Sequence, residues 1–184
     1  SLDMELVVEN MPFNSLISAL NGGKIDAIAA GMTINEERKV NVNFSEPYYA
    51  ATQALLVRSE NAAAYTSLDQ LKGKKIAVQL GTTGDGAAKK LTEEGNVVQF
   101  QTVFEAIMEL NNKKVDAAII DEQPAKVLLA KNPELVQSAL TFPAEYYGIA
   151  IKKDNQELTD AVNKTLARLK SDGTYDKLVA EWIK

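Results

Sequence analysis

Residues 26–38 read DAIAAGMTINEER and combine a short strand with the start of a helix. The small and β-branched residues over 26–30 predict the strand. A helical turn is predicted to follow over 34–38, with Thr33 or Asn35 as its N-cap. This order of strand and then helix recurs along the chain, which predicts an α/β fold with parallel strands.

The residues at this junction have the chemistry of an anion site. Open α/β sheets bind ligands at the carboxyl ends of their strands, and free N–H groups at a helix start suit a carboxylate. The Thr33 hydroxyl adds a donor, and the Arg38 guanidinium adds a planar fork that can bind a carboxylate through two hydrogen bonds. The alternative is that Thr33 only caps the helix and Arg38 is a solvated surface residue.

The remaining elements follow from hydrophobic periodicity and from turn residues. Strands are predicted at 6–8, 54–57, 75–80, 97–100, 115–120, 140–142 and 147–151. Helices are predicted at 13–20, 68–73, 85–94, 103–111, 122–130, 158–169 and 175–184. In the last helix, Leu178, Val179 and Trp182 are expected to face inward.

The composition excludes several kinds of chemistry. The 184 residues include 20 Lys and Arg against 25 Asp and Glu, for a net charge of −5, and they include no Cys and no His. The acidic balance argues against nucleic acid as a partner. Thiol nucleophiles, imidazole bases, disulfides and Cys or His metal sites are excluded. We also expect no metal and no cofactor. No run approaches the roughly 20 apolar residues of a membrane span, and no signal peptide opens the chain, so we expect a mature or trimmed product.

Two further junctions could contact a ligand. The turn Gly81-Thr82-Thr83-Gly84 lacks the Lys of a phosphate-binding P-loop, and its alternative is a short loop whose glycines serve only the backbone. Asp121 follows a buried strand, where its carboxylate either meets a ligand ammonium or caps the next helix; taken alone, the cap is the better interpretation. Phe13 could stack on a ligand, although an aromatic residue at helical spacing is more often core.

Together these junctions offer donors for a carboxylate and one carboxylate for a cation. That combination is what a free α-amino acid zwitterion requires. An enzyme would additionally need an activated acid, base or nucleophile, and none stands out.

Longer motifs occur in a fixed order along the whole chain. They are GKIDAIAAGMTI (23–34), ER (37–38), FSEPYY (44–49), LDQLKGKKIAV (68–78), GTT (81–83), VDAAIID (115–121), YGIA (147–150) and DGTY (172–175). This series strongly resembles the family 3 solute-binding proteins, the polar amino-acid receptors of ABC importers.

The resemblance implies an α/β fold of the type II periplasmic-binding-protein kind. Two lobes with mixed, mainly parallel sheets would be joined by two crossover strands, with hinges near Val57 and Tyr147. Lobe one would comprise 1–57 and 148–184, and lobe two 58–147. Against the family pattern, the first strand and helix of lobe one are missing. A second copy exchanging elements, that is a homodimer, is one expected way to fill the gap.

The resemblance also implies ligand-binding roles. Arg38 would clamp the α-carboxylate, helped by Thr33 and by Thr83 from the other lobe. The Gly31 carbonyl and Asp121 would hold the α-ammonium. The other implied residues are Met32, next to this cluster; Phe13, which would line the side-chain pocket; and Gln79 and Ile120, which would bear on specificity.

The function implied is that of a non-enzymatic receptor. It would bind a free polar amino acid between its lobes, close on it and deliver it to the transmembrane permease of an ABC importer. The implied location is periplasmic or extracellular, with a signal peptide removed and a lipid anchor on the full-length precursor. The alternatives are a dehydratase of cyclic acids on the same fold and the ligand-binding core of a receptor channel or sensor kinase.

Overall fold

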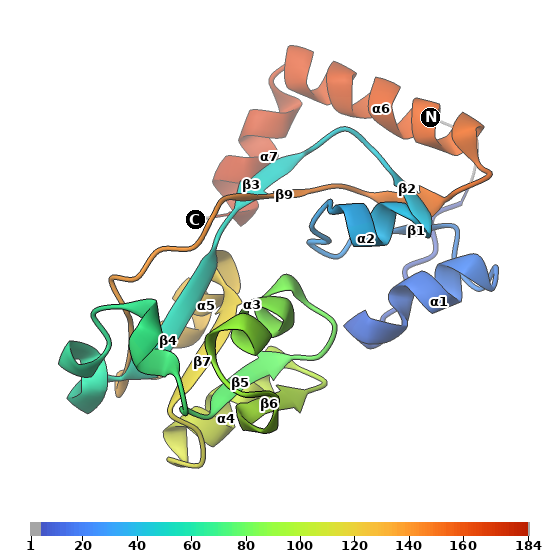
Figure 1. Cartoon of the computed structure of the whole chain (residues 1–184). Coiled ribbons are helices and arrows are strands. Elements are labelled where there is room, and N and C mark those ends of the chain that lie inside the picture. The colour runs from blue at the N-terminus through green and yellow to red at the C-terminus, as the bar shows by residue number, and fades with distance from the viewer. Residues whose placement is uncertain (1–4, 184) are drawn as a thin grey trace. The chain divides into compact units, whose positions relative to one another are not determined.

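The structure is a computed structural model that describes residues 5–183, and it divides into two compact units (Figure 1). Unit one comprises the described residues up to Ala50 and from Glu145 onward, and unit two comprises Ala51–Ala144. The expected bounds, 1–57 with 148–184 and 58–147, differ from these by seven residues at the first boundary and by three at the second. That the two units act as ligand-binding lobes stays a prediction.

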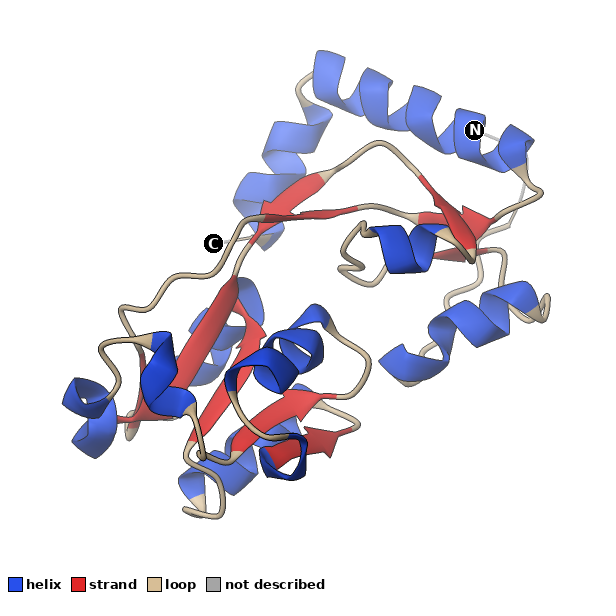
Figure 2. Ribbon diagram, viewed as in Figure 1, coloured by secondary structure: helices blue, strands red, loops and turns tan. Residues whose placement is uncertain are grey.

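A five-stranded sheet forms the centre of unit two (Figures 1 and 2). Its strand order is β6-β5-β7-β4-β8. β5 runs parallel to β6 and β7, whereas β4 runs antiparallel to β7 and β8, so the sheet is mixed. The bounds are β4 (Gln53–Arg58), β5 (Ile76–Gln79), β6 (Val97–Phe100), β7 (Ala117–Asp121) and β8 (Leu135–Gln137).

Helices cover both faces of this sheet. α4 (Val103–Asn111) and α5 (Glu122–Leu129) pack on the face that includes Leu56 and Ala118. α3 (Thr83–Leu91) packs on the opposite face, which includes Leu55 and Ile119. Adjacent strand residues therefore enter different cores, as the two-residue period of a strand requires. The short 3₁₀ helices of this unit are η2 (Ser59–Ala64), η3 (Leu68–Leu71) and η4 (Glu94–Asn96).

Unit one contains an antiparallel sheet of three short strands in the order β1-β10-β2. Its core includes Leu20, Ile28, Met32 and Val42. The strands are β1 (Ala27–Ile28), β2 (Val42–Phe44) and β10 (Ala150–Lys152), and β3 (Tyr49–Ala51) pairs with β9 (Glu145–Tyr147). The helices are η1 (Phe13–Ser15), α1 (Leu16–Asn21), α2 (Glu36–Lys39), α6 (Gln156–Ser171) and α7 (Thr174–Trp182).

The expectation of an α/β fold is confirmed, but two of the expected strands are wrong. A third, at 147–151, is two short strands, β9 and β10, with residues 148–149 between them. Residues 6–8 form no strand; their side chains are exposed, and no described strand pairs with them. Residues 140–142 form no strand either, because Leu140 and Phe142 pack against the core of unit two from a loop. The strand that pairs there is β8, a few residues earlier. A three-residue apolar run fits either arrangement, so the pattern did not distinguish them.

The expected inward face of the last helix is also wrong in part. Leu178 is 44% exposed and Trp182 is 76% exposed. The apolar spacing along α7 is real, but most of that stripe is not covered by the described chain. Within residues 5–183, no helix is long and apolar enough to cross a bilayer.

Candidate functional site

The site residues predicted in unit one lie around Arg38, which is a buried arginine. Its side chain lies on α2, whose N-cap is Asn35: the Asn35 Oδ1 accepts a hydrogen bond from the Arg38 amide at 2.8 Å. Arg38 is only 8% exposed, and its Nη1 donates to the Thr33 carbonyl at 2.8 Å. The guanidinium carbon lies 5.4 Å from the centre of the Phe13 ring. The interpretation of Arg38 as a solvated residue is therefore wrong.

Thr33 is held by the segment around β9 and does not cap α2. Its hydroxyl donates to the Glu145 carboxylate at 2.7 Å, and its backbone forms an isolated bridge with Tyr147. Gly31 adopts a φ of +59°, a conformation that side-chain-bearing residues rarely adopt. The side chain of Met32 is in the core and 1% exposed, so any contact of Met32 with a ligand would come from its backbone.

The first of the site residues predicted in unit two, Thr83, follows the loop between β5 and α3. Thr82 is the N-cap of α3, and its Oγ1 accepts from the Asp85 amide at 3.2 Å. The Oγ1 of the next residue, Thr83, accepts from the Gln53 Nε2 at 3.1 Å. Gly81 adopts a φ of +80°, which explains a glycine at this turn. Thr83 is thus placed at a helix N-terminus, where N–H groups suit an anion.

Gln53 joins this loop to Asp121. The same Gln53 Nε2 donates to Asp121 Oδ1, and Gln53 is buried. Asp121 occupies the N-cap position of α5, but its side chain makes no cap hydrogen bond. The cap interpretation is therefore wrong, and the structure holds the carboxylate beside Thr83 instead.

The neighbouring carboxylate, Glu122, is occupied elsewhere. It forms an ion pair with Lys126 at 3.0 Å and accepts from the Thr52 hydroxyl at 2.9 Å. The hydrogen bond from Lys126, followed by that from Thr52, lowers the pKa of the Glu122 carboxyl. Glu122 is thus part of a surface pair within its own helix.

The two residues expected to set specificity differ in their surroundings. Gln79 is half-buried at the end of β5, and its Nε2 donates to the Gln101 carbonyl at 2.9 Å. Ile120 is buried in the core of unit two. Among the described residues, no three Asp, Glu, His or Cys side chains gather in a way that could hold a metal ion.

Sequence reasoning missed three polar residues in unit two: Gln53, described above, and Asp85 and Gln99, whose side chains hydrogen-bond to each other. A signal existed for two of them. Gln53 is a polar residue directly before the apolar strand residues 54–57, and Asp85 follows Thr82 at the spacing of a capped helix start. Gln99 gives no signal, because a polar residue within an edge strand is ordinary.

We expect Gly84→Ala and Gly86→Ala, both in α3, to change stability in opposite directions. A Cβ on Gly84 would lie 2.9 Å from Gln53 Oε1 and 3.1 Å from the Ile119 carbonyl oxygen, whereas a Cβ on Gly86 meets nothing within 4 Å. Gly84→Ala should cost about 1–3 kcal/mol through overpacking. Gly86→Ala should gain about 0.5–1 kcal/mol from helix propensity. Urea unfolding measures both, and equal effects would contradict the contact.

Comparison with known proteins identifies the family. The chain matches the family described as bacterial extracellular solute-binding proteins, family 3, over residues 1–184. A probable histidine-binding protein of Campylobacter jejuni is 37% identical over 97% of this chain and 70% of its own length. A putative ABC transporter arginine-binding protein of Escherichia coli is 35% identical over 99% of this chain and 76% of its own length.

Solved structures agree with the sequence comparison. An ancestral arginine-binding protein bound to arginine matches with a TM-score of 0.90 and 43% identity, over 96% of this chain and 79% of that one. The fold is that of the type II periplasmic amino-acid-binding proteins. The chain belongs to family 3 of the bacterial extracellular solute-binding proteins.

Proposed function

We propose that this chain binds a free polar L-amino acid and delivers it to the permease of an ABC importer. The observation that carries the proposal is Arg38, whose buried guanidinium donates to the Thr33 carbonyl and whose backbone amide donates to Asn35 Oδ1. A guanidinium held in this way presents a planar set of N–H donors in a fixed orientation. The α-carboxylate of an amino acid matches the fork of this side chain.

The second unit supplies the complementary groups. Thr83 and Asp121 lie side by side through their shared partner Gln53, and Asp121 offers the negative charge that an α-ammonium needs. We assign the carboxylate to Arg38 and Thr33 with Thr83, and the ammonium to Asp121 with the Gly31 carbonyl. In this assignment the Thr33 hydroxyl, which donates to the Glu145 carboxylate in the structure, turns to the ligand carboxylate instead. Only a ligand that contacts both units uses all of these groups, so the proposal includes closure of two lobes on the ligand.

Phe13 and Gln79 would contact the side chain of the ligand and so select among amino acids. Phe13 offers an aromatic face beside the guanidinium, and Gln79 offers an amide that is now bonded to the Gln101 carbonyl. Neither residue carries a charge. Related proteins are named for histidine and arginine, so these polar amino acids are the first candidates.

The remaining elements of the proposal concern location and assembly. The family consists of extracellular solute-binding proteins, and we propose a periplasmic or extracellular location with a lipid anchor on the full-length precursor. We further propose that two copies can exchange elements to form a homodimer. The compared relatives are named as binding proteins, and we propose a non-enzymatic role, with no cofactor.

A thermal-shift screen of the common amino acids against the chain tests this function. A ligand that binds only the folded state stabilises it, by about 2.7 kcal/mol when present at 100 times its Kd. We expect one or a few polar amino acids to raise the Tm, with calorimetry confirming a single site. No shift with any amino acid would contradict the proposal. Release of water from a cyclic carboxylic acid would favour the dehydratase instead.

A further inference from the structure

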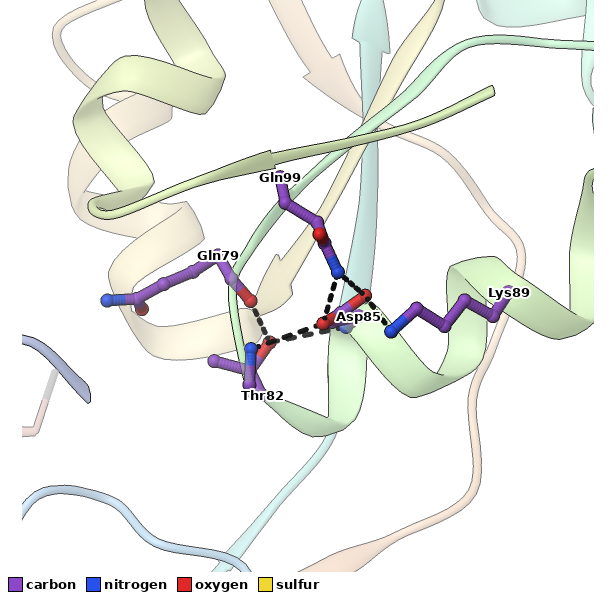
Figure 3. Close-up of polar contacts among 6 residues, drawn as sticks. Gln79, Thr82, Asp85, Lys89 and Gln99 are labelled. Atoms are coloured by element: carbon purple, nitrogen blue, oxygen red, sulfur yellow. Dashed lines mark hydrogen bonds and ion pairs between the residues drawn. The ribbon is translucent and has the colours of Figure 1, made fainter. Parts of the chain in front are cut away.

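Asp85 is a buried carboxylate to which the proposed binding chemistry gives no role. It lies in the first turn of α3, it is 3% exposed, and it is surrounded by polar groups from three elements (Figure 3). A charge in this position is stable only if hydrogen bonds or ion pairs compensate its loss of water. Its partners therefore indicate what the carboxylate holds in place.

Those partners come from the adjacent strand, the loop and the helix. The Gln99 Nε2 on β6 donates to both carboxylate oxygens, at 2.9 and 2.8 Å. The Gly81 amide donates to Oδ2 at 3.2 Å. The Lys89 Nζ, one turn further along α3, lies 3.1 Å from Oδ1. The ion pair with Lys89 lies within α3, whereas the contacts with Gln99 and Gly81 connect separate segments.

The contact with Gly81 differs from an ordinary helix cap. In a capping box, the acidic side chain returns to the amide of the N-cap residue itself. Here the N-cap residue is Thr82, and its amide donates to the Gln79 carbonyl at 3.3 Å, while its hydroxyl donates to the same carbonyl at 2.8 Å. The Asp85 carboxylate reaches one residue further back and fixes Gly81, the residue with the left-handed backbone.

These contacts determine the position of Thr83. Thr82 is fixed by the Gln79 carbonyl, and Gly81 is fixed by the Asp85 carboxylate, which is itself anchored to β6 through Gln99. These two residues directly precede Thr83. The Thr83 amide and hydroxyl then point in directions set before any ligand arrives. Preorganised donors bind more tightly because they lose less conformational freedom on binding.

We propose that Asp85, anchored by Gln99, is the positioning residue that holds the loop 80–83 in its ligand-binding shape. The inference rests on the proposed function, because it assigns a purpose to the loop that presents Thr83. It differs from a purely structural role of Asp85 as a favourable charge at a helix N-terminus. A purely structural role predicts a general loss of stability, and positioning predicts a local change in the loop.

An isosteric exchange of donor and acceptor tests the contact. Asp85→Asn replaces one of the two acceptor oxygens with an amide donor that faces the Gln99 Nε2, while the remaining oxygen can still accept from the Gly81 amide. Adding Gln99→Glu restores complementarity: the new amide donates to the carboxylate at position 99, and its oxygen still accepts from the Gly81 amide. Asp69→Asn is the matched control, since it removes one exposed charge in the same unit. If Asp85→Asn does not fold, Gln99→Met removes the same contact from the other side. Gln99 is exposed and lies on an edge strand.

Amide hydrogen exchange measures how well the loop 80–83 is ordered in the absence of ligand. We expect Asp85→Asn to speed exchange at Gly81, Thr82 and Thr83 by about tenfold or more while β5 and β7 stay protected, and we expect the double variant to restore protection. Unchanged loop exchange, or faster exchange throughout the sheet, would overturn the positioning role.

Calorimetry with L-arginine, L-histidine and L-glutamine then measures whether the order of the loop affects ligand affinity. We expect Asp85→Asn to weaken whichever of them binds by about tenfold, with recovery in the double variant and no change in Asp69→Asn. Faster loop exchange with unchanged affinity would overturn the link between loop and ligand. If the unmodified chain binds no amino acid while the loop still responds, the proposed function fails, and the positioning of the loop stands on the exchange data.

Discussion

Replacing Arg38 with alanine is expected to abolish measurable binding of the amino acid that the chain recognises. Removing one partner of a desolvated charge pair costs about 2–5 kcal/mol, which is a loss in affinity of roughly 30-fold to several thousand-fold. Arg38 is buried and its fork is fixed by the Thr33 carbonyl, so little else in unit one can replace it. Calorimetry on the wild type and on Arg38→Ala measures the loss.

Two further variants show whether geometry or charge is responsible. Arg38→Lys keeps the charge and loses the planar fork, so we expect an intermediate loss of about tenfold. Arg168→Ala is the control: it removes an arginine from unit one whose side chain is 64% exposed in a surface pair with Asp172. It should leave affinity unchanged. An Arg38→Ala variant that is folded by circular dichroism and binds like the wild type would remove Arg38 from the site.

Unit two shows how much of a fold hydrophobic periodicity can predict. The predicted strand at 97–100 and the predicted helix at 103–111 coincide with β6 and α4. Both elements are predicted from local patterns. The strand is a short apolar run bounded by polar residues. The helix begins with a capping box formed by Thr102 and Glu105. Where the signal is local and strong, the sequence suffices.

The errors in the fold occur where a partner decides the structure. Residues 6–8 have the composition of a strand, but a strand exists only when a neighbour satisfies its backbone, and no described strand does so. The run 135–137 is no more apolar than 140–142, yet only the former lies opposite β4. Pairing of this kind depends on residues far away in the chain, so a local pattern cannot distinguish the two runs.

The same distinction separates the site residues that could be predicted from those that could not. Arg38, Thr83 and Asp121 each stand at a junction between a strand and a helix, which is a local feature. Gln53 is separated by 30 residues from Thr83 and by 68 from Asp121, and its contacts depend on the antiparallel pairing of β4 with β7. The packing of the sheet brings these groups together.

Replacing Asp121 with asparagine is expected to remove the preference of the chain for an α-ammonium. Asparagine keeps an oxygen that can accept from Gln53 Nε2, so the local structure should persist while the charge is lost. We expect affinity for the amino acid to fall about 100-fold, equivalent to roughly 2.7 kcal/mol. The corresponding 2-hydroxy acid, which lacks the ammonium, should bind the wild type weakly and the variant equally weakly. Calorimetry with both ligands on both proteins separates the charge effect from general damage.

The neighbouring carboxylate provides the control for this charge. Glu122→Gln removes the same charge one residue away, but Glu122 pairs with Lys126 and Thr52, so affinity for either ligand should not change. If Asp121→Asn weakened the amino acid and the hydroxy acid alike, the carboxylate would matter for shape and not for the ammonium. If both acidic variants weakened the amino acid equally, the general negative potential of this unit would attract the ligand, and Asp121 would lose its specific role.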